Sequence, residues 1–403
     1  MKIALLTPEY VTESNFDGGL ANYLQRIAIS MKQRGHQVEI FTKSDRDDTI
    51  IHQGITVHRI NPKISLFKLF NKLTLFRFST SLLILSLSYT LRKRLLERHE
   101  KARFDIIQPS SYLACGIFTT INRPAPIVTR ISSYEPLMRN YYKKKYTLNQ
   151  RLQEWLEKLA ICRSNSVYSP SKLLSHVLSS RQSINVDVLP PPFFLDTVNF
   201  DESIFNKYLL EKKYLLFYGT LGILKGAEVL TKVLPRVLSQ FHDLYFVIVG
   251  KDTKNIHGSS MLQVILKQAK YHNNRIIYLG VLKHNQLYPI IENCQAVVLP
   301  SLIDNLPNTM LESMYFGKVV IGTKGTSFEE VIEDGISGIL VNRNDINGLS
   351  QAIQKIWRMS EKEKKVIGKR AKERISVLLP DMICLRTERY YKDVIIKWNK
   401  NLK

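Results

Sequence analysis

Residues 300–317, PSLIDNLPNTMLESMYFG, follow the short apolar run AVVL at 296–299, which is typical of a buried strand. Polar residues then turn the chain, and apolar residues return at helical spacing, at Leu306, Met310 and Met314. Asp304 or Asn305 is expected to cap that helix, with Pro307 in its first turn. A strand, a loop and a helix start in this order point backbone N–H groups at the edge of a sheet, an arrangement that favours phosphate.

Two carboxylates bracket this stretch, Asp304 in the loop and Glu312 eight residues on. Glu312 sits among apolar residues, which is an expensive place for an unpaired charge. A ligand with adjacent hydroxyls would satisfy it, since an ionised carboxylate accepts two hydrogen bonds. A plain capping role is the alternative interpretation of the local pattern.

The size and composition of the chain predict two globular domains. Its 403 residues exceed one comfortable core, and 44% hydrophobic residues exclude wholesale disorder. The four cysteines form no CxxC pair, which favours a reducing compartment and argues against a zinc site. The apolar part of the N-terminus, MKIALLTPEY, is too short for a signal peptide and is typical of a first strand.

The net charge of +23 is the unusual number in this composition. Such an excess attracts phosphate groups in nucleic acid, nucleotides or anionic lipid, and no nucleic-acid-binding pattern is present. Residues 64–98 mix apolar side chains with cations, and the apolar run between Arg77 and Arg92 is too short to span a bilayer. We expect this segment to lie on an anionic membrane surface; a core helix with a solvated basic face is the alternative.

The first half alternates strands and helices. A strand at 2–7, a glycine pair, a helix over about 20–34 and a strand at 38–41 predict a βαβ unit in a parallel sheet. Gly18 and Gly19 would let a substrate approach the backbone closely, although a turn that merely needs glycine explains them equally. The pair is no GxGxxG fingerprint, so a dinucleotide site is not indicated. The acids at 45–47 are expected in a solvated loop rather than at a metal.

Further strands are expected at 104–107, 126–129, 167–169 and 186–189. Residues 130–135, RISSYE, would stand at the carboxyl end of the second of these, where open α/β sheets bind ligands. The triple proline at 190–192 is the best candidate for an interdomain linker.

The second half restarts the alternation with a strand at 214–218, the loop GTLGILKG at 219–226 and a helix to about 240. The order Lys-Gly excludes a Walker loop, but Lys225 at a helix start could neutralise a diphosphate. More strands are expected at 244–249, 275–279 and 318–321. Every candidate ligand residue of this half follows a strand, so we expect these residues to gather at one edge of one sheet.

Together these motifs resemble those of the bacterial glycosyltransferases of family 4, over nearly the whole chain. The resemblance depends on the Gly18–Gly19 loop, on residues 219–226 in place of the family's Gly-Arg-Leu…Lys-Gly loop, and on Asp304-x7-Glu312 in place of its Glu-x7-Glu. Residues 325–338, GTSFEEVIEDGISG, also fit, with Glu330 and Gly335 at family positions.

The resemblance implies an α/β fold of GT-B type, with two facing Rossmann-like domains of parallel sheets and a C-terminal helix that crosses back to the first domain. The implied divisions are an acceptor-binding domain at 1–190, a nucleotide-sugar-binding domain at 191–385 and the returning helix at 386–403. Three departures from the family are visible. Thr220 replaces the usual arginine, Asp304 is one methylene shorter than the usual glutamate, and Ser132 stands where many members have histidine.

Site roles follow from the resemblance. Glu312 would hold the ribose hydroxyls of a nucleotide, Lys225 would contact the diphosphate, and Asp304 would lie near the donor sugar. The implied donor-binding residues are Gly18, Gly19, Gly219, Thr220, Lys225, Asn305, Leu306, Pro307 and Glu312, with N–H groups around 305–307 aiding Lys225. Ser132 and Glu135 would line the acceptor cleft.

The function implied is that of a retaining, metal-independent glycosyltransferase. It would move a sugar from a nucleoside-diphosphate-sugar to a lipid-linked or saccharide acceptor, in polysaccharide or glycolipid synthesis, at the inner face of the plasma membrane. It would need no cofactor and bind no nucleic acid. The alternatives are a nucleotide-sugar 2-epimerase of the same architecture and a non-catalytic sugar-nucleotide-binding partner of a membrane assembly.

Overall fold

A computed structural model describes residues 1–14, 19–62, 77–132, 135–142, 147–182, 184–195, 199–255 and 257–401. The chain divides into two compact units, each with its own parallel sheets. Unit 1 comprises Met1–Leu137, Lys143–Phe193 and Leu378–Lys403. Unit 2 comprises Met138–Tyr142 and Phe194–Val377.

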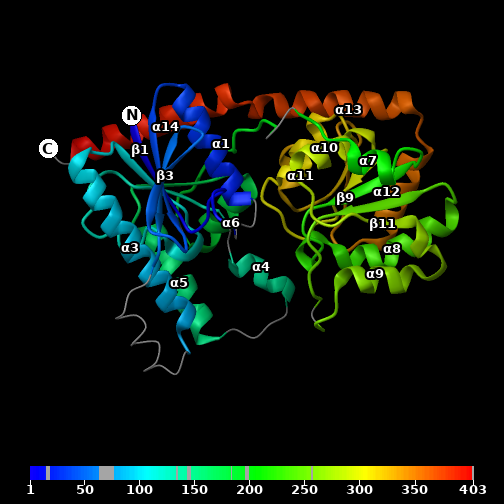
Figure 1. Ribbon diagram of the computed structural model, residues 1–403, viewed down its shortest axis with the longest axis horizontal. Helices are drawn as coiled ribbons and strands as arrows, with labels where there is room; N and C mark the ends of the chain where they lie inside the picture. Colours follow the sequence, from blue (N-terminus) through cyan, green and yellow to red (C-terminus); the bar gives the residue numbers. More distant parts are fainter. Residues whose placement is uncertain are drawn as a thin grey trace. The chain divides into compact units, whose positions relative to one another are not determined.

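Unit 1 is built on a five-stranded sheet with the order β3-β4-β2-β1-β5 (Figure 1). Its strands are β1 (Lys2–Thr7), β2 (Gln37–Lys43), β3 (Asp48–His52), β4 (Ile55–Ile60) and β5 (Ile106–Pro109). A smaller parallel sheet holds β6 (Val128–Arg130), β7 (Ser166–Ser169) and β8 (Asp187–Val188). Bridges from Ile107 to Ile127 and from Ser110 to Arg130 join the two sheets, so β5 and β6 end at the same edge.

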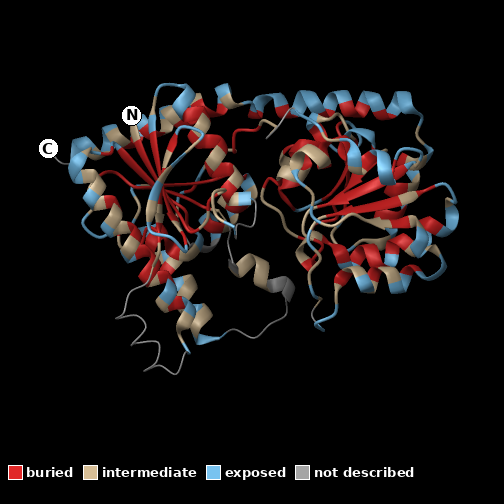
Figure 2. Cartoon of the chain, viewed as in Figure 1, coloured by how far each residue is buried: buried red, intermediate tan, exposed pale blue. Residues whose placement is uncertain are grey.

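Helices cover both faces of this sheet. The helices of unit 1 are α1 (Gly19–Gln33), α3 (Ser79–Lys101), α5 (Leu148–Cys162), α6 (Lys172–Gln182) and α14 (Pro380–Asn401), with η1 at Tyr112–Ala114. Side chains alternate along β1: Ile3 and Leu5 pack with α1 and α14, while Ala4 and Leu6 pack with α3. A strand with both faces buried is continuously apolar, which explains the sequence KIALLT (Figure 2).

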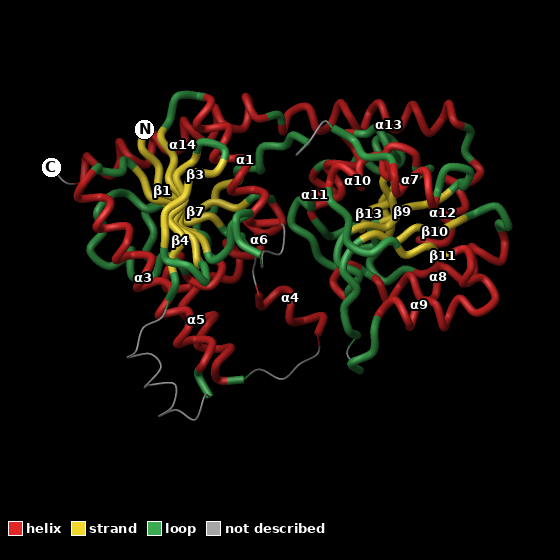
Figure 3. The backbone as a smooth tube through the Cα atoms, in the orientation of Figure 1, coloured by secondary structure: helices red, strands yellow, loops and turns green. Residues whose placement is uncertain are grey.

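Unit 2 contains a six-stranded, wholly parallel sheet with the order β11-β10-β9-β12-β13-β14 (Figure 3). Its strands are β9 (Tyr214–Tyr218), β10 (Tyr245–Val249), β11 (Ile276–Tyr278), β12 (Ala296–Val298), β13 (Val320–Thr323) and β14 (Ile339–Val341). Its helices are α7 (Ser203–Tyr208), α8 (Ala227–Gln240), α9 (Met261–Ala269), α10 (His284–Asn293), α11 (Asn308–Tyr315), α12 (Ile346–Arg358) and α13 (Glu361–Ile375). Short 3-10 turns are η2 (Ile223–Lys225), η3 (Lys270–Arg275), η4 (Ser327–Glu330) and η5 (Ser376–Leu378), and α4 (Glu135–Tyr142) lies at the division between the units.

The C-terminal helix belongs to unit 1, as the fold class predicts. Its predicted start at 386 is wrong, because α14 begins at Pro380 and the chain re-enters unit 1 at Leu378. A proline fits the first helical position, where its missing N–H costs nothing. Tyr391 donates a hydrogen bond to Gln108 next to β1, and Arg34 of α1 pairs with Glu388 at 3.0 Å, which fastens the helix to this unit.

The β3–β4 hairpin is not foreseen by the sequence analysis. This hairpin is the antiparallel part of the five-stranded sheet of unit 1. Gln53 and Gly54 at its turn both have positive φ, 49° and 72°. That conformation suits a two-residue hairpin turn. The acids at 45–47 lie in the exposed loop before β3, as expected.

The membrane-facing segment predicted at 64–98 is only partly described, because residues 63–76 lie outside the described residues. Membrane binding by the described part is not tested and stays a prediction. Leu83 and Tyr89 of α3 are exposed, whereas Ile84, Leu87, Leu91 and Leu95 form a face that is buried in the core of unit 1. Packing against β2 and α5 removes this face from solvent. No described helix is both long and apolar enough to span a bilayer.

Candidate functional site

Four strands of unit 2 end in loops that are bonded to one another. After β9, the Leu221 N–H donates to the Lys251 carbonyl at 2.8 Å, in the loop that follows β10. The Gly250 N–H of that loop donates to the Gly280 carbonyl after β11 at 2.7 Å. The Leu302 N–H after β12 donates to the Leu224 carbonyl at 2.8 Å. The loops therefore form one connected carboxyl edge, where open parallel sheets bind ligands.

Glycines permit the close contacts of this edge. Gly226 has φ 76°, and a Cβ there would lie 1.9 Å from the Pro300 carbonyl oxygen. Gly250 has φ 133°, and its Cβ would lie 2.0 Å from the Gly219 carbonyl oxygen. Both the space and the conformation therefore exclude a side chain at Gly226, in the predicted phosphate loop, and at Gly250, in the loop after β10.

Lys225 and Asp304 meet at this edge. Nζ of Lys225 lies 2.7 Å from Oδ2 of Asp304, although 79 residues separate them in sequence. Ser301 Oγ also donates to Oδ2 of Asp304, at 3.0 Å. The Lys225 side chain is 34% exposed and that of Asp304 10% exposed. The pair thus places a half-exposed cation over a nearly buried anion, directly beside the loop glycines.

The predicted helix cap in this loop is wrong. Helix α11 begins only at Asn308, and its N-cap residue, Pro307, makes no side-chain cap. Leu306 adopts φ 49°, and its N–H donates to Ser327 Oγ at 2.7 Å, so the chain turns before the helix can begin. The Asn305 N–H donates to Asp304 Oδ1 at 3.1 Å.

These bonds also change the expected role of 305–307 as a donor of backbone N–H groups to a diphosphate. Two of the groups are engaged within the chain, and proline has none. The positive end of the α11 dipole remains at this position.

Glu312 lies in α11 and is 2% exposed. Nε2 of His284, at the start of α10, lies 3.8 Å from its Oε1. The hydroxyl of Tyr218, the last residue of β9, donates to the Thr309 carbonyl at 2.6 Å. Burial and then the negative charge of Glu312 raise the pKa of the Tyr218 phenol.

His284 was missed by the sequence analysis, because a lone histidine beside a lysine carries no local signal. Its ring stacks on Tyr288 with a centroid distance of 5.4 Å. Thr220, where the family has arginine, is half-buried beside Gly219.

The predicted residues of unit 1 are only partly described. Gly18 lies outside the described residues, and Gly19 is the exposed first residue of α1. A Cβ at Gly19 would meet nothing within 4 Å, so neither space nor positive φ requires glycine there. Ser132 follows β6, with its Oγ 2.7 Å from Ser110 Oγ, and Glu135 is the first residue of α4.

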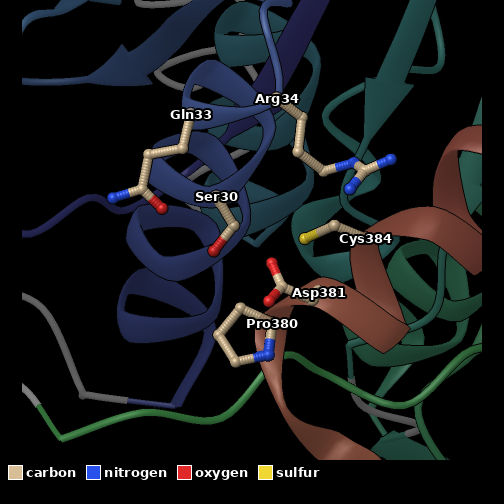
Figure 4. Close-up of a pocket in the computed structure, with 6 residues that line it drawn as sticks. All are labelled: Ser30, Gln33, Arg34, Pro380, Asp381 and Cys384. Atoms are coloured by element: carbon tan, nitrogen blue, oxygen red, sulfur yellow. The ribbon is translucent and has the colours of Figure 1, made fainter.

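A separate hollow of about 320 Å³ lies in unit 1, between the end of α1 and the start of α14 (Figure 4). This hollow is lined by Ser30, Gln33, Arg34, Pro380, Asp381 and Cys384. None of these six is a predicted site residue. Within the described part of the chain, no group of three or more His, Cys, Asp or Glu side chains is placed to hold a metal ion.

This architecture, two units each with its own parallel sheets, is that of the GT-B fold. The chain is similar over 98% of its length to sucrose-phosphate synthase from Thermosynechococcus elongatus (99% of that chain, TM-score 0.77, 17% identity). HepE of Anabaena, solved in complex with UDP and glucose, matches 97% of this chain and 99% of its own (TM-score 0.71, 16% identity). These likenesses confirm the predicted fold.

The sequence comparisons give the family. Glycosyltransferase Family 4 matches residues 17–196, and Glycosyl transferases group 1 matches residues 200–374. An uncharacterized glycosyltransferase of Methanocaldococcus jannaschii, MJ1607, is 21% identical over 371 residues, which cover 88% of this chain and 89% of that protein. The chain belongs to glycosyltransferase family 4, as the motifs indicate.

Proposed function

We propose that this protein is a retaining, metal-independent glycosyltransferase whose donor is a nucleoside-diphosphate sugar. Its acceptor is lipid-linked or a saccharide, in the synthesis of cell-surface polysaccharide or glycolipid. It acts peripherally at the inner face of the plasma membrane. The observation that carries the proposal is the Lys225–Asp304 pair within a glycine-lined carboxyl edge. HepE, a structural neighbour, was solved in complex with UDP, which supports a nucleotide-containing donor.

In this proposal Lys225 acts on the leaving group. Breaking the sugar–phosphate bond concentrates negative charge on the departing diphosphate. A cation already fixed at that position stabilises this charge with little reorganisation. Asp304 holds Lys225 in place in the ligand-free chain, and an arriving diphosphate would compete for the ammonium group through its larger negative charge.

Glu312 would hold the nucleoside. Its carboxylate can accept hydrogen bonds from two adjacent ribose hydroxyls. These two hydrogen bonds would help to offset the desolvation free energy of a carboxylate that is only 2% exposed. His284 at 3.8 Å would restrict how the carboxylate turns.

Retention of configuration requires the acceptor to attack on the face that the diphosphate leaves. In the proposed step, the bond from the anomeric carbon to the phosphate oxygen breaks as the bond to the acceptor oxygen forms. The leaving phosphate oxygen takes the acceptor's proton, so no protein base is needed. This agrees with Ser132 at the cleft position, because a serine hydroxyl cannot act as the base at neutral pH.

The proposed acceptor and membrane location are supported by the charge of the chain. The net charge of +23 supports an anionic surface or acceptor, because positive potential concentrates phosphate-bearing groups. The described residues of α3 supply basic side chains rather than a free apolar face.

The test begins with the melting temperature of the full chain in a panel of nucleoside diphosphates and their sugars. A ligand that binds only the folded state raises the melting temperature by mass action. The best donor is then incubated with lipid-linked and saccharide acceptors, with and without EDTA, and the anomeric configuration of the product is read by NMR. A product of inverted configuration, or activity abolished by EDTA, contradicts the proposed mechanism.

Incubation with donor alone separates the alternatives. A C2 epimer of the sugar would indicate an epimerase. Nucleotide binding with neither transfer nor hydrolysis would indicate a non-catalytic binding partner.

A further inference from the structure

Arg130, the last residue of β6, is a buried cation. It is 6% exposed, and its guanidinium carbon lies 3.7 Å from the ring centroid of Tyr23 in α1. Nη1 donates to Ser132 Oγ at 3.2 Å. Nε is buried and has no hydrogen-bond acceptor.

No carboxylate compensates this charge among the residues that the structure describes. Two other arginines of unit 1 pair with carboxylates: Arg98 with Glu39 at 2.8 Å, and Arg59 with Glu13 at 2.9 Å. Removing a cation from water costs several kcal/mol in proteins, roughly, unless an anion and hydrogen bonds offset it. The partners of Arg130 within the described residues are neutral groups, the Tyr23 ring and Ser132 Oγ.

The tyrosines around Arg130 do not supply the missing anion. The hydroxyls of Tyr23 and Tyr168 lie 2.7 Å apart, and Tyr168 donates to Gln108. Burial raises the pKa of Tyr23 more than the charge of Arg130 lowers it. Both phenols therefore stay neutral at physiological pH, and the contact of Arg130 with Tyr23 is a cation–π interaction.

The surroundings of Arg130 suit an oxyanion. Ser110 and Ser132, whose hydroxyl oxygens lie 2.7 Å apart, follow β5 and β6 at the same carboxyl edge. Hydroxyl groups can donate to a phosphate oxygen, and the guanidinium fork can bind two such oxygens. Tyr23, whose ring Arg130 contacts, stands four residues after Gly19, the first described residue of α1.

We propose that Arg130 binds a phosphate group of a substrate at the carboxyl edge of unit 1, with Ser132 and Ser110 as hydroxyl donors. This rests on the proposed function, because it gives the substrate phosphate a residue that the family motifs do not include. We assign this phosphate to a phosphorylated acceptor; assignment to the donor diphosphate is an alternative outcome of the test.

The test compares the wild-type full chain with Arg130→Met, and with Arg103→Met as the control. Arg103 is exposed, so the control removes the same charge from the surface. The melting temperature is followed as inorganic phosphate rises at constant ionic strength, with and without a saturating nucleoside diphosphate. The affinity for that nucleotide is measured by calorimetry. Repeating the phosphate titration in a Lys225→Ala background removes the contribution of the unit 2 site.

If the phosphate belongs to the acceptor, wild type and Arg103→Met are stabilised by inorganic phosphate while the nucleotide is bound. Arg130→Met needs about tenfold more phosphate or shows no response, with nucleotide affinity unchanged. If it belongs to the donor, Arg130→Met binds the nucleotide about tenfold more weakly. In either case the ligand-free melting temperature of Arg130→Met equals or exceeds that of wild type, because an uncompensated charge has been removed.

The proposal is overturned if Arg130→Met keeps both the phosphate response and the nucleotide affinity, or if its only effect is a lower ligand-free melting temperature. Should Arg130→Met not fold, Arg130→Lys keeps the charge but loses the fork, and it should show a partial loss of the same response. A wild-type chain that responds to phosphate but to no nucleoside diphosphate would refute the proposed function and leave this site standing.

Discussion

In unit 2, Lys225 is half-exposed and already paired with Asp304, whereas in unit 1 Arg130 is buried and no described carboxylate lies beside it. Both cations stand at the carboxyl edge of a parallel sheet. The paired cation costs the ligand-free chain little and must be drawn from its partner when a ligand binds. The unpaired cation costs stability until an anion arrives. If both proposals hold, the two units would offer positive charge to a ligand in different ways.

The largest expected effect tests the paired cation. Lys225→Ala should reduce turnover by roughly 10² to 10³-fold, the loss typical of removing one electrostatic contact to a developing charge. The melting temperature should fall only slightly, because Asp304 keeps the Ser301 and Asn305 donors. Turnover and melting are compared with Lys232→Ala, an exposed lysine of α8. Unchanged turnover would remove Lys225 from the mechanism.

A substitution at Gly226 tests whether the loop that contains Lys225 is rigid. Gly226→Ala should destabilise unit 2 by about 3 kcal/mol, since a positive φ and a Cβ 1.9 Å from the Pro300 oxygen both oppose it. Gly258→Ala is the matched control, with φ 84° and nothing within 4 Å, and should cost about 1 kcal/mol. Urea unfolding measures both variants. Equal losses would mean that the loop relaxes and the crowding is unimportant.

Glu39 shows how much a paired buried charge contributes to the folding stability of unit 1. Burial raises its pKa, but hydrogen bonds from His58 and Arg98, with the charges of Arg98 and Lys2, bring the pKa down from 4.5 to about 2. Because the pKa of Glu39 is lower in the folded than in the unfolded protein, its ionised carboxylate stabilises the folded protein at pH values above 4.5. This stabilisation is lost as the pH falls toward about 2.

Glu39→Gln should therefore cost about 2 kcal/mol at neutral pH, because glutamine keeps part of the hydrogen bonding. The difference from wild type should shrink across the acid window when unfolding by urea is followed at several pH values. Glu97→Gln, which removes an exposed carboxylate paired with Arg94, should have almost no effect. A difference that persists near pH 2 would contradict this account.

The smallest effect concerns the nucleoside end of the unit 2 edge. Glu312→Gln should raise the dissociation constant of the preferred nucleoside diphosphate about tenfold, since a neutral amide accepts weaker hydrogen bonds than a carboxylate. Turnover at saturating donor should change much less than affinity. Glu292→Gln on the exposed face of α10 serves as control. Calorimetry that finds equal affinities would exclude Glu312 from nucleotide binding.

The periodicity of the sequence predicted the strands of both units well where they are buried on both faces. The strand expected at 214–218 is β9 itself, and that at 2–7 is β1. The β3–β4 hairpin was missed because it lies at the edge of its sheet, where the apolar signal is weaker and the exposed Ile51 interrupts the pattern. The sequence of residues 64–98 left a core helix and a membrane-surface helix as alternatives, because both kinds of helix share the same amphipathic spacing.

Local sequence determined the alternation of strands and helices, the glycine-rich loops and the family to which the chain belongs, because these depend on residues close together in the chain. Tertiary structure alone decided that Lys225 meets Asp304, that His284 stands beside Glu312, and that Arg130 is buried without a described carboxylate partner. The first two contacts join residues that are far apart in the sequence. The third depends on which side chains surround Arg130 at the end of β6. The packing of parallel strands brings such residues to one edge, and no local pattern records which charges will then be paired.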